Sequence, residues 1–285
     1  MLLDTLIIFD YSGTLSLEAP LFAAPDSLMR ELAASGLADF GIDSPHIFWD
    51  KLVNPTWTEG STTAAGYKKV LHDSIIASLH PDLSIQRRVR LVDAVAAFAD
   101  RYFSRSRIDP GWAPILKRIN RHPSVKVVIA TDHYAEATGY ILNFLGEWQI
   151  EASAAGDAVR HTRASSFIVA NSADIGVHKA DLRFWEILKT GLRTDAVRSI
   201  LLIDDFGCNE QSQDVYSEKH KVETRIKQTI TTLESVFSAS VQVVPVMIGA
   251  DLHERDRRWE NAVLEASVTI DRHLAAGKIH RLAEK

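Results

Sequence analysis

Short apolar runs rich in β-branched residues recur along the chain and predict the strands of a sheet. They lie at residues 5–9, 125–130, 167–170, 199–203 and 241–248. Several of these runs are apolar at every position rather than at alternate positions, which is typical of parallel strands that are covered on both faces. The pattern therefore predicts a parallel sheet buried between two layers of helices.

Helical periodicity separates the later apolar runs. Leu182, Trp185 and Leu188 share one face of a predicted helix. Two further stripes with helical spacing are Val215, Val222, Ile226, Ile230, Leu233 and Phe237, and then Trp259, Val263, Ala266, Ile270 and Leu274 within residues 254–275. The last stripe predicts a final helix packed on the sheet. Strands that alternate with helices predict an α/β fold with a doubly wound, Rossmann-like parallel sheet.

The interval between the first two predicted strands is about a hundred residues long, far more than one crossover helix requires. It contains four predicted helices, at residues 26–35, 44–53, 63–79 and 85–103, punctuated by prolines. We expect residues 17–107 to form an inserted α-helical cap domain. The α/β core then comprises residues 1–16 and 108–285.

Composition narrows the class of protein. The 285 residues are 46% hydrophobic and 24% charged with a net charge of −5, which is ordinary for a globular enzyme. No basic stripe indicates a nucleic-acid partner, and no apolar run reaches the ~18 residues of a membrane span. The single cysteine, Cys208, excludes an intramolecular disulfide. With no recognisable signal peptide, we expect a cytoplasmic protein that is a monomer or a homodimer.

Polar residues follow the predicted strands at their carboxyl ends. These residues are Asp10, Ser12 and Thr14 after the first strand, Thr131, Asp132 and His133 after the second, Lys179 in the loop beyond the third, and Asp204, Asp205 and Asn209 after the fourth. Ligands of open parallel sheets bind outside the carboxyl ends of the strands, so this edge is the predicted site. One aspartate after a strand is usually a turn residue, but so many reactive groups in this order favour a functional site.

The chemistry of this set is specific. Carboxylates from two strand ends suit Mg²⁺, which takes a few carboxylates together with water and substrate phosphate. A lysine ammonium such as that of Lys179, with donors near Thr131, can hold phosphate oxygens. An aspartate beside such a site can act as a nucleophile through an aspartyl-phosphate.

Four stretches of the chain resemble the motifs of the haloacid dehalogenase-like hydrolases, the HAD superfamily. In order, they are IIFDYSGTL, VVIATD, SADIGVHKADLRFWEIL and ILLIDDFGCNE. The third departs slightly, because Ala180 replaces the common proline. An insertion directly after the first motif is similar to the helical C1-type cap of that family. The resemblance covers most of the chain outside the predicted cap.

The resemblance implies a Mg²⁺-dependent phosphohydrolase that acts on a small phosphorylated metabolite. Asp10 would be the nucleophile and a metal ligand, with Asp205 and the main-chain carbonyl of Ser12, and Asp204 would support them. Thr131 and Lys179 would bind the transferring phosphoryl group. Thr14 would shape the nucleophile turn beside the substrate, Asp132 would lie at the substrate, and Asn209 would fix the loop or support the metal ligands.

Ser12 is the departure from the family, because most phosphatases carry a general-acid aspartate there. One interpretation is that Asp132, His133 or Glu59 supplies the proton. A second is a good leaving group, such as an acyl phosphate; alkyl phosphates would then react weakly if nothing replaces the acid.

Three further interpretations of Ser12 change the activity itself. A phosphonatase-like enzyme would need a cap lysine, for which Lys51, Lys68 and Lys69 are the unmarked candidates. A catalytically silent binding protein is also open. A dehalogenase is disfavoured by the paired acids Asp204 and Asp205.

The cap is expected to select the substrate. Residues 54–67 are predicted to include a polar, glycine-containing loop that faces the nucleophile. Trp57, Glu59 and Tyr67 are the candidate substrate contacts, although Trp57 and Tyr67 can equally belong to the core of the cap. Cys208 is expected to be a bystander.

Overall fold

The computed structural model describes residues 5–122, 124–160, 166–192, 197–214, 222–248 and 254–283. Six parallel strands form one sheet in the order β3-β4-β2-β1-β5-β6. Their bounds are β1 (Thr5–Phe9), β2 (Val125–Thr131), β3 (Ala152–Ala154), β4 (Phe167–Asn171), β5 (Ser199–Asp204) and β6 (Ser240–Pro245). The α/β fold with a doubly wound parallel sheet is confirmed. The short strand β3 was not expected from the sequence.

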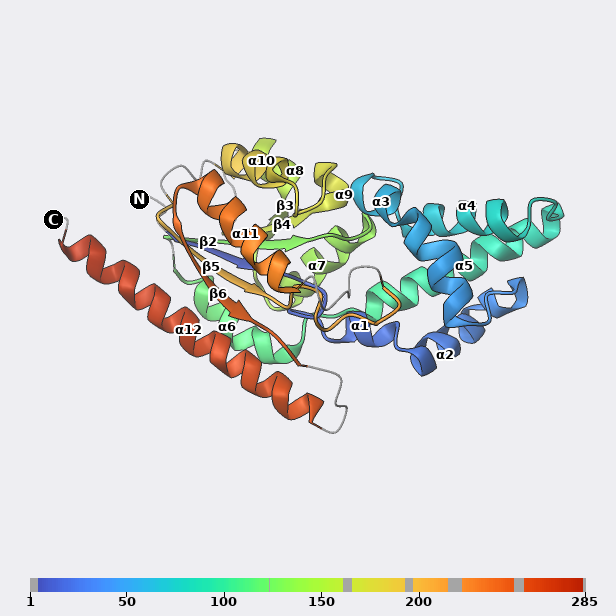
Figure 1. Cartoon of the computed structure of the whole chain (residues 1–285), viewed down its shortest axis with the longest axis horizontal. Coiled ribbons are helices and arrows are strands. Elements are labelled where there is room, and N and C mark those ends of the chain that lie inside the picture. The colour runs from blue at the N-terminus through green and yellow to red at the C-terminus, as the bar shows by residue number, and fades with distance from the viewer. Residues whose placement is uncertain are drawn as a thin grey trace.

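Helices cover both faces of the sheet because its central strands are apolar on both sides (Figure 1). On one face lie α6 (Ala113–Ile119), α7 (Glu136–Glu147) and α12 (Arg255–Ala283), and on the other lie α8 (Ala155–Arg160), α10 (Leu182–Leu192) and α11 (Val222–Phe237). The faces alternate residue by residue along β1, since Ile7 and Phe9 belong to one apolar cluster and Leu6 and Ile8 to the other. Val215, expected on the stripe of α11, lies outside the described residues.

The segment between β1 and β2 is helical, as expected of the predicted cap. It contains α1 (Glu18–Phe22), α2 (Pro25–Ser35), the short helix η1 (Leu37–Phe40), the π-helical η2 (Ile47–Val53), α3 (Asn54–Thr62), α4 (Tyr67–Leu79) and α5 (Ile85–Arg105). These elements extend away from the sheet at its carboxyl edge (Figure 1). The bounds of the cap as a separate domain stay a prediction.

The expected loop within residues 54–67 is largely a helix, and the expected helix at 63–79 begins only at Tyr67. Pro55 is the second residue of α3, which continues directly from η2. The hydroxyls of Ser61 and Thr62 donate to the carbonyls four residues earlier, each at 2.6 Å. Residues that favour loops by sequence therefore satisfy their polar groups on the helix itself.

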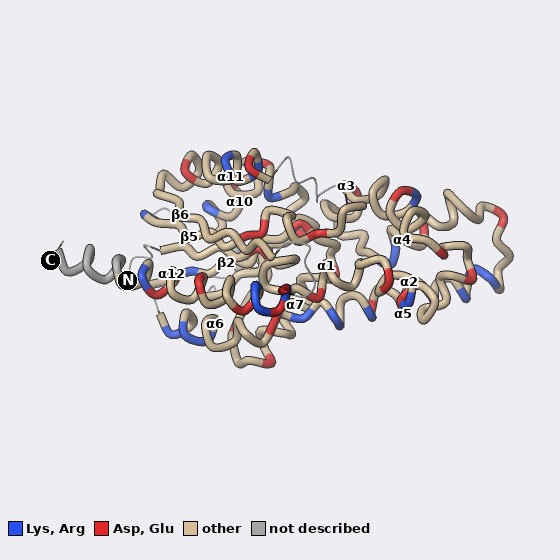
Figure 2. The backbone as a smooth tube through the Cα atoms, turned by 60° about the horizontal axis from the view of Figure 1, so that its bottom comes forward, with Lys and Arg blue, Asp and Glu red and all other residues tan. Residues whose placement is uncertain are grey.

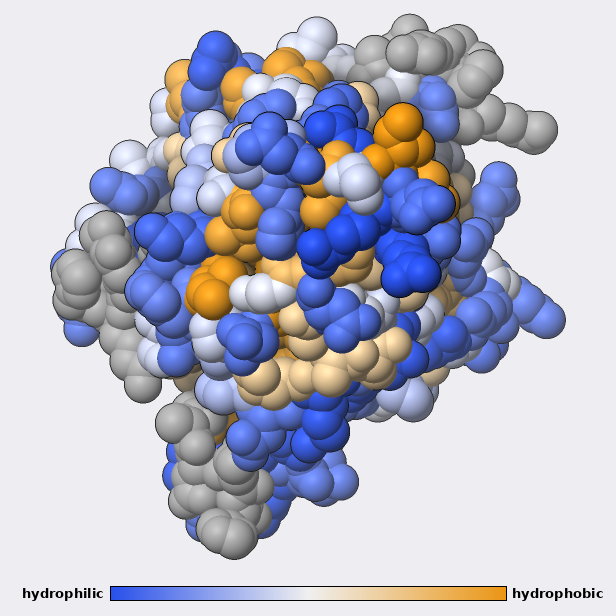
Figure 3. Space-filling view, turned by 90° about the vertical axis from the view of Figure 1, so that its right-hand side faces the viewer, coloured by the Kyte–Doolittle hydropathy of each residue, from blue (hydrophilic) through white to orange (hydrophobic). Residues whose placement is uncertain are grey.

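The surface carries mixed charge and scattered apolar groups. Basic and acidic residues are interspersed along the described chain (Figure 2). The end of the molecule that Figure 3 faces shows separate hydrophobic patches among hydrophilic side chains. On α5, Ile85, Val89 and Val92 are exposed beside a buried stripe. Within the described residues, no helix has both the length and the apolar character that crossing a bilayer requires.

The cap segment packs tightly on the core at Gly60. A Cβ atom on Gly60 would lie 2.4 Å from Cε1 of Tyr134, whose ring stacks on Tyr67 with the centroids 4.2 Å apart. Gly60→Ala is therefore expected to lower the free energy of unfolding by about 1–3 kcal/mol through overpacking. Urea unfolding provides the measurement.

Gly139→Ala is the matched control, because it lies within α7 and an added Cβ meets nothing within 4 Å. It is expected to stabilise the protein by up to about 1 kcal/mol. Equal effects of the two substitutions would contradict this description of the contact between cap and core.

Candidate active site

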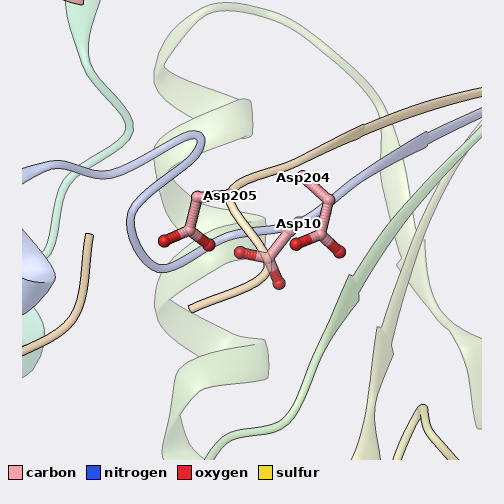
Figure 4. A group of neighbouring side chains, drawn as sticks. All are labelled: Asp10, Asp204 and Asp205. Carbon is pink, nitrogen blue, oxygen red and sulfur yellow. The ribbon is translucent and has the colours of Figure 1, made fainter. Parts of the chain in front are cut away.

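Three carboxylates meet at the carboxyl ends of β1 and β5. Phe9 pairs with Ile203 in the parallel register, so Asp10 and Asp204 come next to each other, and Asp205 follows. One carboxylate oxygen from each of Asp10, Asp204 and Asp205 lies within 4.8 Å of the others (Figure 4). All three side chains are buried. The sequence prediction that these acids converge agrees with their positions.

The turn after Asp10 requires glycine at position 13. Gly13 has a φ of 75°, and a Cβ there would lie 2.5 Å from Oδ2 of Asp205. The carbonyl of Tyr11 accepts hydrogen bonds from the main-chain N–H groups of Leu15 and Ser16 and closes the turn. Backbone conformation and close approach therefore both exclude a larger residue.

Thr14 does not contact the cleft. It is fully buried, and its Oγ1 accepts a hydrogen bond from the main-chain N–H of Asp205 at 2.9 Å. The hydroxyl ties the nucleophile turn to the loop after β5, in agreement with the expected role of Thr14 in that turn, while its contact with substrate stays a prediction. Asn209 has a similar role: its Nδ2 donates to the carbonyls of Gly13 and Val246.

Lys179 connects the strand ends. Its Nζ donates to Asp10 and, at 3.2 Å, to Asp204, while its main-chain N–H donates to Oδ1 of Asp132 at 2.8 Å. Thr131, the last residue of β2, is buried and lines the same cleft as Asp10, Asp132 and Lys179. The predicted nucleophile and the predicted phosphate-binding residues therefore face one space.

The charges of this cluster are unbalanced. Burial raises the pKa of Asp10 to about 7, although the ammonium of Lys179 opposes the shift. Burial, and then the charges of Asp10 and Asp204, raise the pKa of Asp205 well above its usual range. Three buried carboxylates with a single lysine in contact are the donor set and the charge that a small divalent cation such as Mg²⁺ fits.

Glu210 is a functional candidate that the sequence reasoning missed. Its Oε1 accepts a hydrogen bond from Oγ of Ser12 at 2.6 Å, and both residues line the cleft beside Asp10. Burial, followed by the nearby charge of Asp214, raises the pKa of Glu210 to about 8. A carboxyl group thus reaches the position at which Ser12 replaces the expected acid. The only signal in the sequence is the glutamate that ends ILLIDDFGCNE.

The three proton donors expected from the sequence are placed less favourably than Glu210 for proton transfer beside Ser12. Glu59 lies exposed on α3, in a surface hollow with Lys69 and Asp73, and is not among the described residues that line the cleft. Its substrate contact stays a prediction. Asp132 lines the cleft and burial raises its pKa, but its Oδ1 accepts from the main-chain N–H of Lys179, and no contact between Asp132 and Ser12 is observed among the described residues. His133 lines the cleft, but burial lowers its pKa to about 4 and favours the neutral imidazole.

His133 makes stability depend on pH. Its Nδ1 accepts from the main-chain N–H of Tyr134 at 2.8 Å, and its Nε2 contacts the hydroxyl of Tyr102 at 2.9 Å. The folded-state pKa lies below the usual 6.5. The contribution of neutral His133 to the free energy of unfolding is therefore present above about pH 6.5. As the pH falls towards 4, about 3 kcal/mol of it is lost.

Urea unfolding of the wild type and of His133→Gln between pH 7 and pH 4 measures the contribution of His133 to the free energy of unfolding. The stability difference between the two proteins is expected to shrink by about 3 kcal/mol over that range, because glutamine does not titrate. A difference that stays constant would show that His133 is not buried in the neutral form.

Of the other candidate residues in the cap, the two aromatic residues line the cleft and the lysines do not. Trp57 and Tyr67 both line the cleft, and the Trp57 ring lies 5.5 Å from that of Tyr134 and stacks on His178. The cap lysines do not reach it: Lys68 pairs with Asp100 and Lys69 with Asp73. Lys51 lines the same outer hollow as Glu59. Cys208 is half-buried and is not among the described residues that line the cleft.

Comparison with solved structures gives remote likenesses. No model of a protein family matches the chain, and no curated protein does. A solved 2-haloacid dehalogenase from Pseudomonas syringae pv. Tomato DC3000 is 15% identical over 75% of this chain and 84% of its own, with a TM-score of 0.46.

Two further solved structures are similar at this level. A predicted phosphoglycolate phosphatase from Haemophilus somnus 129pt is 14% identical over 86% of each chain, with a TM-score of 0.41. A hydrolase from Pseudomonas syringae is 14% identical over 85% of this chain and 94% of its own, with a TM-score of 0.35.

Proposed function

We propose that the protein is a HAD-type hydrolase that removes the phosphoryl group from a small phosphate monoester through an aspartyl-phosphate on Asp10. The observation that carries the proposal is the buried cluster of Asp10, Asp204, Asp205 and Lys179, of which Asp10 and Lys179 line the cleft between the sheet edge and the cap helices. An aspartate that only capped a turn after a strand would not explain why three acids and a lysine are buried together.

The cluster would hold Mg²⁺ through Asp10 and Asp205, with the main-chain carbonyl of Ser12 as a further donor and Asp204 in support. Bound Mg²⁺ would offset the negative charge of the carboxylates and of the phosphoryl oxygens. Lys179 adds a fixed positive charge, and its contact with Asp10 favours the ionised nucleophile.

The first chemical step forms a bond between a carboxylate oxygen of Asp10 and phosphorus, and the ester bond to the leaving oxygen breaks. The leaving oxygen then requires a proton. Because Ser12 donates to Glu210 at 2.6 Å within the cleft, we assign this proton to the Glu210 carboxyl group, delivered directly or through the hydroxyl of Ser12.

The second step returns the proton. Water attacks the phosphorus of the aspartyl-phosphate, the bond between phosphorus and Asp10 breaks, and the Glu210 carboxylate accepts the proton that the water loses. Asp10 leaves as a carboxylate, so the enzyme ends in its initial state. The same carboxyl group serves both half-reactions, which is the role that the missing aspartate has in related phosphatases.

The alternatives to a phosphohydrolase gain no support from the site. A phosphonatase-like enzyme would need a cap lysine at the substrate, yet no cap lysine lines the cleft within the described residues. A silent binding protein was suggested by Ser12 alone, and Glu210 supplies a carboxyl group beside it.

A substrate panel tests the proposed function. Phosphate monoesters, acyl phosphates and phosphonates are incubated with the purified protein, with Mg²⁺ and with a chelator, and released phosphate is measured. The proposal expects Mg²⁺-dependent release from esters and none from phosphonates. Release from phosphonates alone would favour the phosphonatase interpretation.

A further inference from the structure

The cleft has a polar end and an aromatic remainder. Asp10, Thr131 and Lys179 mark the polar end, where the phosphoryl group belongs under the proposed function. Eight of the described lining residues are Phe, Trp or Tyr. Among them Trp57, Tyr134 and Tyr67 form a continuous wall, with ring centroids 5.5 Å and 4.2 Å apart along it. Flat, apolar groups lie favourably on such rings.

Charge around this wall disfavours an anionic leaving group. Among the described lining residues, Lys179 is the single lysine or arginine, and it already contacts Asp10 and Asp204. The acidic residue Asp214 also lines the cleft. A second phosphate or a carboxylate on the leaving group would therefore meet acids and no further described cation, which costs affinity.

Two buried polar atoms of residues that line the cleft have no hydrogen-bond partner in the protein. The indole Nε1 of Trp49 and the hydroxyl of Tyr134 make no hydrogen bond with the protein, although the two residues are only 6% and 4% exposed. Buried donors of this kind are rare and are costly to leave unmet. An indole N–H can only donate, so Trp49 requires an acceptor and not an ammonium group.

We infer that the natural leaving group is an uncharged, flat or apolar alcohol that presents a neutral oxygen acceptor to Trp49 and Tyr134. Carbonyl, ether and hydroxyl oxygens are the acceptors of this class. The rings provide the contact surface, the two donors fix the orientation, and the lack of a second lysine or arginine among the described lining residues disfavours anionic esters. This inference names the substrate class of the proposed phosphohydrolase and rests on that function for the identity of the phosphoryl end.

Binding of non-hydrolysable phosphonates tests the inference without turnover. Benzylphosphonate, its 3-acetyl and 4-acetyl derivatives and its 4-carboxy derivative are titrated calorimetrically into the full chain in the presence of Mg²⁺. At least one acetyl compound is expected to bind roughly three- to tenfold more tightly than benzylphosphonate, as one additional hydrogen bond provides. The carboxy compound is expected to bind more weakly than benzylphosphonate.

Trp49→Phe and Tyr134→Phe assign the effect to the two donors. Each variant keeps an aromatic ring and removes one polar atom, and at least one is expected to bring the ratio of acetyl to parent affinity close to one. No acetyl advantage in the wild type, a ratio unchanged in both variants, or tighter binding of the carboxy compound would each overturn the inference.

The two proposals can fail separately. Phosphonates that bind in the expected order to a protein that hydrolyses no phosphate ester would overturn the proposed function, while the preference of the cleft for a neutral, flat ligand would remain. Hydrolysis of phosphate esters together with the reverse order of phosphonate affinities would support the proposed function and overturn the inference about the leaving group.

Discussion

Replacing Asp10 by asparagine is expected to lower kcat for a phosphate monoester by at least about 10⁴-fold, because the amide is not a nucleophile and also removes a metal ligand. The substitution keeps the size of the side chain. Burial raises the pKa of Asp10 in the folded protein, so its charge is held at a cost in stability. The neutral amide is therefore expected to leave the folded state at least as stable as the wild type. Released phosphate and thermal unfolding measure the two effects.

Asp93→Asn is the matched control, because Asp93 is exposed on α5 and makes the same chemical change away from the cleft. Its kcat is expected to stay within twofold of the wild type, roughly the scatter of a neutral surface substitution. Full activity of the Asp10→Asn protein would refute nucleophilic catalysis by this residue.

Glu210→Gln has the second-largest expected effect. It should lower kcat/KM for alkyl phosphates by about 10²–10³-fold, because an alkoxide leaving group depends on proton transfer. For aryl phosphates, whose leaving groups need little protonation, the loss should be at most about tenfold. Glu59→Gln, on the exposed face of α3, is the control for the chemical change. An equal loss for both substrate classes would contradict proton transfer by Glu210.

The Ser12 position gives an independent check of the same assignment. The Ser12 hydroxyl lies 2.6 Å from the Glu210 carboxyl group, so an aspartate introduced at position 12 would face that group. Ser12→Asp alone is therefore expected to lower activity, because two carboxyl groups this close share one proton and the Glu210 carboxyl group no longer releases it readily to the leaving oxygen. In the Glu210→Gln background the same substitution is expected to recover part of the turnover of alkyl phosphates. No recovery would mean that position 12 does not lie on the path of the proton.

The position of Glu210 also changes the activity that is expected on alkyl phosphates. The sequence alone suggests weak activity on alkyl phosphates unless another residue replaces the acid at Ser12. Asp132, His133 and Glu59 were the candidates, and the structure places them in a main-chain hydrogen bond, in a buried neutral state and on an outer surface, respectively. With Glu210 in position, alkyl phosphates become expected substrates.

The sheet and the acid cluster were accessible from sequence for a physical reason. Continuous apolar runs mark buried parallel strands, and residues such as Asp10 and Asp204 follow those runs directly, so their meeting depends only on strand order. Glu210 lies five residues after Asp205 in a loop. Its approach to Ser12 depends on the path of two turns that no periodicity encodes.

The cap was predicted less well. Hydroxyl residues, Pro55 and Gly60 make residues 54–62 resemble a loop, yet they lie in α3, where the hydroxyls of Ser61 and Thr62 are satisfied by carbonyls of the preceding turn. Gly60 serves close packing on Tyr134 rather than a turn. The orientation of that helix directs Trp57 to the cleft and Glu59 away from it, which a loop prediction cannot specify.

The aspartyl-phosphate itself is the central claim, and intact-mass analysis of the acid-quenched protein tests it most directly. The wild-type protein is mixed with Mg²⁺ and an aryl phosphate, quenched within the first turnover, and digested to locate the adduct. We predict a mass gain of one phosphoryl group on the peptide that contains Asp10, stronger in Glu210→Gln, in which the second step is slowed, and absent in Asp10→Asn. Release of phosphate by the wild type with no such adduct in either active protein, or an adduct that persists in Asp10→Asn, would contradict the account.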